Sequence, residues 1–149
     1  MGDSNVFLLK TEKERQKFTR RLLDDIGILE KLIEEGHFDE ENEKIGAEQE
    51  LCLVDEYLKP SSIAHEILKK AGNPDFTTEL ARFNAEINLE PLLFKGSCLS
   101  KMEENVRAGL NEMRRVARDF KQKVIYTGIL PTIRKNDVEL ENITPEERY

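Results

Sequence analysis

Two glutamate-rich segments with alternating polarity constrain the fold of this chain more than any other feature. They span residues 46–50 and 84–90. Successive side chains of a β-strand point to opposite faces, and most residues between the glutamates are apolar. Each segment is therefore predicted to be a strand with one core face and one carboxylate face. The acids on the carboxylate faces are Glu48 and Glu50 in the first strand, and Glu86 and Glu90, with Asn88 between them, in the second.

If the two strands are neighbours in one sheet, four carboxylates meet on a single patch. Two carboxylates about 5 Å apart repel by roughly 3 kcal/mol at an effective dielectric near 20. A divalent cation held by oxygen ligands would offset this repulsion. Arg82 lies on the same predicted face, so an ordinary salt bridge is an alternative. A carboxylate face that is simply solvated is the third interpretation.

The composition excludes several classes of protein. With 149 residues, the chain forms one domain or part of a larger one. Charged residues make up 36% of it and the net charge is -7, which disfavours a nucleic-acid-binding surface. No apolar run approaches the roughly 20 residues of a membrane span. Cys52 and Cys98 are too few for a disulfide framework, so we expect reduced thiols and a cytoplasmic protein.

The N-terminal part predicts an amphipathic helix over residues 11–35, followed by an acidic connector. Gly36 is expected to terminate this helix, and residues 1–44 are expected to form a helical extension. Its mixed charges favour packing on the domain or on a partner over a membrane surface, and a homo-oligomer is possible. The apolar positions recur at helical spacing: Phe18, Leu22, Ile26, Leu29 and Ile33.

The remaining pattern predicts an α+β fold, an antiparallel sheet of few strands packed with helices. We expect, in chain order, a strand over 45–54, a short helix capped by Ser61 or Ser62 and running to Lys70, a strand within 77–90, a loop over 92–98, a helix from Ser100 to about Lys123 and a strand over 124–127. Three strands do not make a complete sheet, and residues 142–149 have the pattern of a helix start. We therefore expect residues 45–149 to be the N-terminal portion of a longer domain.

The order of these motifs resembles the glutamate–cysteine ligase family and related carboxylate–amine ligases. Residues 45–51 resemble the family's Gly-x-Glu-x-Glu strand, and residues 86–90 resemble its second acidic strand. The long helix, the following strand and the Gly-x-x-Pro turn at 128–131 correspond to the family's next elements. Residues 143–149 resemble the stretch just beyond, so the resemblance covers residues 45–149.

The resemblance implies a partial glutamine-synthetase-like catalytic fold and an ATP-dependent ligase of glutathione biosynthesis. Such enzymes phosphorylate a carboxylate, usually that of glutamate, and an amine then attacks the acyl phosphate. By resemblance, Glu48, Glu50, Glu86 and Glu90 would be ligands of Mg²⁺ or Mn²⁺, and the partners would be amino-acid substrates and ATP. Many members have a threonine shortly after the second acidic strand, whereas Pro91-Leu92-Leu93 follows here, which leaves the substrates open. We expect the chain to be inactive alone.

A non-catalytic role is the alternative. The acidic face would then be a docking surface, and the helix over residues 11–35 would bind a partner. Asn84 and Asn88 are compatible with either function, because their amides could bind a ligand or satisfy backbone groups at the strand ends.

Overall fold

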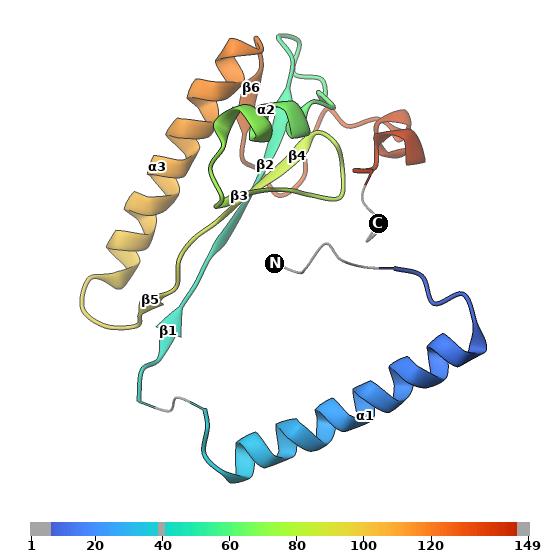
Figure 1. Cartoon of the computed structure of the whole chain (residues 1–149). Coiled ribbons are helices and arrows are strands. Elements are labelled where there is room, and N and C mark those ends of the chain that lie inside the picture. The colour runs from blue at the N-terminus through green and yellow to red at the C-terminus, as the bar shows by residue number, and fades with distance from the viewer. Residues whose placement is uncertain (1–6, 39–40, 146–149) are drawn as a thin grey trace. The chain divides into compact units, whose positions relative to one another are not determined.

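The computed structural model describes residues 7–38 and 41–145 (Figure 1). The chain divides into two compact units, whose principal segments are Met1–Glu43 and Lys44–Pro145. Each unit is described below by itself. No helix in the described ranges is both long enough and apolar enough to span a bilayer.

The first unit contains helix α1, Glu12–Glu34, which confirms the predicted amphipathic helix. Thr11 begins it with a capping box: its hydroxyl accepts a hydrogen bond from the Glu14 N–H, while the Glu14 carboxylate accepts one from the Thr11 N–H. Glu35 is the C-cap of the helix, and Gly36 follows with φ of 66°. None of the helix residues, all of which the structure describes, is buried.

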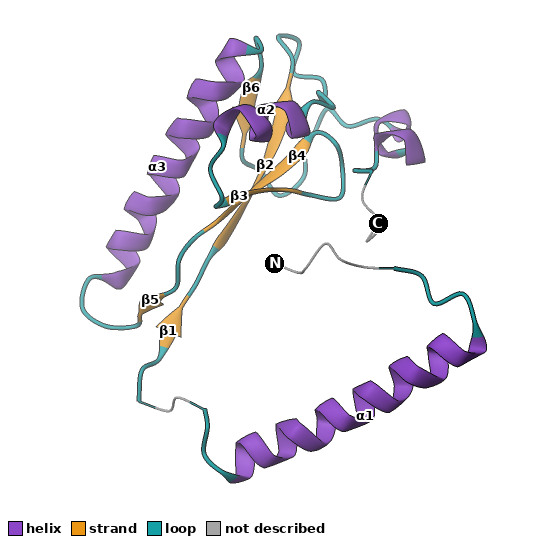
Figure 2. Cartoon of the chain, in the orientation of Figure 1, coloured by secondary structure: helices purple, strands orange, loops and turns teal. Residues whose placement is uncertain are grey.

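The second unit is built on a four-stranded antiparallel sheet with the order β3-β4-β2-β6. A separate two-stranded ladder joins β1 to β5, and Figure 2 shows the strands in orange. The α+β class with an antiparallel sheet of few strands is thus confirmed. The strands are β1 (Lys44–Ile45), β2 (Glu48–Val54), β3 (Phe76–Thr78), β4 (Asn84–Asn88), β5 (Leu92–Leu93) and β6 (Lys123–Ile125).

The two helices of this unit pack against one face of the sheet. They are α2, Ala64–Ala71, and α3, Cys98–Asp119. Because side chains alternate along β2, Leu51 and Leu53 enter this core from the face opposite Glu48 and Glu50. The other face retains the polar residues and, at one end, a small apolar cluster of Cys52, Val54 and Leu130. Buried members of the main core include Leu51, Leu53, Ile67, Ala85, Ile87, Met113 and Val124.

The predicted beginning of the short helix was wrong. Helix α2 starts at Ala64, with Ile63 at the N-cap position and no side-chain cap. Ser61 instead donates its N–H to the Leu53 carbonyl, which extends the edge of β2. The Ser62 hydroxyl donates to Asn142 Oδ1 at 3.0 Å. Both serines therefore bond to residues outside the helix, and neither caps it.

The predicted bounds of the long helix also shift toward the N-terminus. Helix α3 begins at Cys98, after Ser97, so Ser100 lies inside it and does not cap it. Its end comes before Lys123 because Lys121 adopts φ of 58° and the Gln122 N–H bonds back to the Ala117 carbonyl. This left-handed turn releases Lys123 to begin β6.

Three short strand features differ from the expected elements. The first predicted strand is divided into β1 and β2 at Gly46-Ala47. The expected loop over 92–98 contains β5, and β3 was not predicted at all.

Toward the C-terminus, short 3-10 turns span Lys135–Val138 and Leu140–Asn142, and Ile143 bridges to Ala81. Of the helix start predicted at 142–149, residues 146–149 lie outside the described residues.

Candidate functional site

The pairing of β2 with β4 brings three of the four predicted acids onto one face of the sheet. In this antiparallel ladder Glu50 is the partner of Glu86, and Glu48 is the partner of Asn88. Cross-strand partners project from the same face, with Cβ atoms about 4.5–5.5 Å apart. The two acidic strands are therefore neighbours, as the sequence argument required.

Glu90 is placed differently from the other three acids. Strand β4 ends at Asn88, and Glu90 is exposed beyond it. Between the pairs Glu48↔Asn88 and Ile45↔Leu92, the β4 side has one more residue than the β2 side. An extra residue of this kind interrupts the alternation of side chains. Strand β4 therefore does not extend to Glu90, whose role as a metal ligand stays a prediction.

Glu86 is the buried acid of the group, with 7% of its surface exposed. Burial raises the pKa of this carboxyl to about 7, with further contributions from a side-chain hydrogen bond to Glu79 and from the charges of Glu48 and Glu79. Glu48 and Glu50 on the neighbouring strand are exposed. Deprotonating Glu86 therefore places a poorly solvated charge in the middle of an acidic row, which is unfavourable without a cation.

Glu79 is a member of the site that the sequence argument missed. It follows β3, whose Thr77 is the cross-strand partner of Glu86. Two residues after Thr77, Glu79 is on the same face in an extended chain. The signal in the sequence was the alternation from Thr77 to Glu79, but a three-residue strand is too short to be recognised by periodicity.

Buried amides complete the acidic face. Asn88 is 7% exposed and donates from Nδ2 to the Thr77 hydroxyl at 3.0 Å. Among the described residues, Asn88 Oδ1 and Asn84 Oδ1 are buried without a hydrogen-bond partner. Amide and carboxylate oxygens are the donors that Mg²⁺ and Ca²⁺ take.

This donor set fits a hard divalent cation in its chemistry and in its placement on the sheet. The side chains are not drawn together, however: within residues 7–38 and 41–145, no group of three or more His, Cys, Asp or Glu side chains is arranged to hold a metal ion. Metal binding by Glu48, Glu50, Glu86 and Glu90 therefore stays a prediction.

Arg82 and Cys52 lie at the border of the acidic face, and neither neutralises its negative charge. The Arg82 guanidinium donates to the Glu141 backbone carbonyl at 3.3 Å, which is a neutral acceptor. Cys52 lies on the face beyond Glu50, and burial, with the charge of Glu50, raises the pKa of its thiol. A raised pKa keeps the thiol protonated, so Cys52 is not set up as a nucleophile.

A comparison with known families identifies the family of this chain. The family model of glutamate-cysteine ligase family 2 matches residues 44–149, which contain all six strands, α2 and α3. The chain belongs to glutamate-cysteine ligase family 2. Comparisons with curated proteins and with solved structures found no match. The matched segment starts at β1, so helix α1 lies outside the matched residues.

Proposed function

We propose that the protein is an ATP- and magnesium-dependent carboxylate–amine ligase of the glutamate–cysteine ligase type. It would form an amide through an acyl phosphate, with this chain contributing part of the metal site. Family membership supports ligase activity. The strongest support for a cation on the sheet is Glu86, a carboxyl with a pKa of about 7 beside Glu48, Glu50 and Glu79.

Glu48, Glu50 and Glu86 would hold the cation, which is Mg²⁺ or Mn²⁺ in this proposal. A bound magnesium ion supplies charge neutralisation and alignment of the ATP phosphates with the acceptor carboxylate. The residues themselves perform two tasks. The β2–β4 ladder fixes the separation of Glu50 and Glu86, and Glu79 holds Glu86 in position through their hydrogen bond.

Binding of a cation is coupled to the proton on Glu86. A carboxylate ligand must be deprotonated, so the pKa of about 7 predicts that affinity rises with pH through neutrality. Glu79 would release its hydrogen bond to the Glu86 proton at the same time. The protein is proposed to work in the cytoplasm, where the free thiols of Cys52 and Cys98 stay reduced.

The test is release of ADP that requires Mg²⁺, a carboxylate substrate and an amine together, measured on the native protein. Glu50→Gln and Glu86→Gln are expected to abolish this release and to keep the wild-type circular dichroism spectrum. Glu56→Gln, an exposed acid next to β2, is the matched control and should retain it. Full turnover in both site variants, or ADP release that needs no amine, would contradict the proposal.

A second candidate function is a non-catalytic interaction module. The observation that favours it is α1, which exposes its whole apolar stripe: Phe18 is 55% exposed and Ile33 62%. Exposed apolar surfaces of this kind mark interaction sites. A protein that binds a partner through α1 and shows no magnesium-dependent turnover would support the module.

A further inference from the structure

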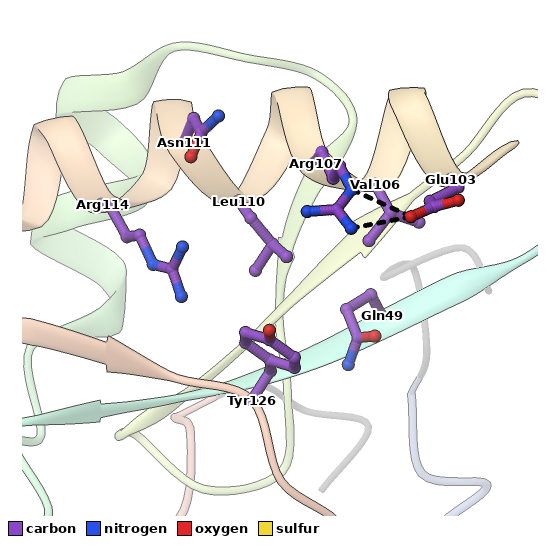
Figure 3. A pocket seen from close by; sticks show the side chains of 8 residues that line it. All are labelled: Gln49, Glu103, Val106, Arg107, Leu110, Asn111, Arg114 and Tyr126. Carbon is purple, nitrogen blue, oxygen red and sulfur yellow. Dashed lines mark hydrogen bonds and ion pairs between the residues drawn. The ribbon is translucent and has the colours of Figure 1, made fainter. Parts of the chain in front are cut away.

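A small pocket lies on the opposite side of the sheet from the acidic face. Gln49 alternates with Glu48 and Glu50 along β2, so its side chain projects toward α3. The pocket has a volume of about 230 Å³ and is formed between α3 and the ends of β2 and β6 (Figure 3). The lining residues on which the argument depends are Glu103, Arg107, Leu110, Arg114 and Tyr126.

The pocket contains two guanidinium groups in different environments. Arg107 is held by Glu103, with its Nε and Nη2 donating to one carboxylate oxygen at 3.0 and 2.7 Å. Arg114 lies over the ring of Tyr126, 5.6 Å from the ring centroid. In the described part of the chain, no carboxylate forms an ion pair with Arg114. The pocket therefore has an excess of positive charge in a protein with net charge -7.

An apolar wall separates the two cations. Arg107 and Arg114 are seven residues apart on α3, so their Cα atoms are about 10 Å apart along the helix. Figure 3 shows Leu110 between them, pointing toward the same space as the two arginines, with Tyr126 on the facing strand segment. A ligand that fits this pattern has two anionic ends and a short apolar stem.

We propose that this pocket is a binding site for a small organic dicarboxylate. Each guanidinium offers a planar fork that matches a carboxylate, and the stem would contact Leu110 and Tyr126. Glu103 already occupies Arg107, but both side chains of that pair are largely exposed, at 64% and 72%. The attraction within an exposed ion pair is weak, so a ligand carboxylate displaces Glu103 at small cost. The site is separate from the acidic face and does not require a metal.

The proposal is tested by titrating the 149-residue chain with glutarate in the presence of EDTA, with the Tyr126 ring resonances observed by NMR. Glutaramide, a neutral molecule of the same length, is the matched ligand control. We expect saturable shifts with glutarate and none with glutaramide. Equal responses to the two ligands, or no saturable response to glutarate, would overturn the proposal.

Two variants locate the binding. Arg114→Gln should weaken glutarate binding at least tenfold. Arg118→Gln, which removes another exposed charge from α3 outside the pocket, should leave it unchanged. Equal weakening in both variants would show non-specific attraction to the helix and refute the site. Glu50→Gln should bind glutarate as the wild type does, so failure of this proposal is distinguishable from failure of the proposed metal site.

Discussion

Replacing Glu86 by glutamine should stabilise the metal-free protein at alkaline pH and have much less effect at acidic pH. Glutamine has nearly the same shape as the protonated acid but cannot ionise. The pKa of Glu86 rises from an ordinary value of 4.5 to about 7 in the folded state, chiefly because of burial. Folding therefore favours the protonated carboxyl.

The sign and size of the effect follow from this difference in pKa. Below pH 4.5 the carboxyl is protonated in both folded and unfolded chains, and it costs no stability. As the pH rises from 4.5 through 7, the unfolded chain loses its proton first and the free energy of unfolding falls. Above pH 7 the loss reaches about 3 kcal/mol, since one pKa unit corresponds to about 1.4 kcal/mol.

The assay is urea unfolding followed by far-UV circular dichroism, in EDTA, at pH 4.5, 6, 7 and 8. The chain has no tryptophan, so backbone ellipticity is the suitable signal. We expect the stability difference between Glu86→Gln and the wild type to grow by about 3 kcal/mol from pH 4.5 to pH 8. Glu56→Gln, at an exposed position, should show no such growth. A difference that is independent of pH, or one that shrinks as pH rises, would refute the account of Glu86.

Two further predictions concern the core and the thiols. Gly109→Ala should destabilise the sheet unit by about 1 kcal/mol in urea unfolding, because the new Cβ would lie 3.0 Å from Ile87 Cγ2. In Gly27→Ala in α1, the new Cβ meets nothing within 4 Å, so this control variant should raise the helicity. Equal gains in stability and helicity from both variants would contradict the packing of Gly109 against Ile87. Cys98 should react with a thiol reagent at neutral pH, whereas Cys52 should be protected by its burial and by the raised pKa of its thiol. Mass spectrometry measures the two rates of modification, and equal rates would contradict the buried position of Cys52.

The alternating acids were predictable because they depend on a local property of strands. A period of two places Glu48 and Glu50 on one face whatever the rest of the chain does. The pairing of Glu50 with Glu86 is non-local, and it entered the sequence argument only as a condition, supported by the family resemblance. The fold class followed from the same local patterns, since α1 and α3 have strong helical periodicity.

The missed features depend on contacts between distant residues. Ser62 does not cap α2 because its hydroxyl bonds to Asn142, 80 residues later in the chain. Strand β3 has three residues and β5 has two, too few for a periodic signal. Glu79 joins the acidic face only because β3 pairs with β4, so its hydrogen bond to Glu86 could not be predicted from local sequence.

The central claim is that the acidic sheet face holds a divalent cation. The most direct test is calorimetric titration of the chain with Mg²⁺ at pH 8, with and without ATP. We predict saturable binding that weakens at least tenfold in Glu50→Gln, is unchanged in Glu56→Gln, and declines below pH 7 as Glu86 gains its proton. Absence of binding at pH 8 under both conditions, or equal binding by the wild type and Glu50→Gln, would contradict the claim.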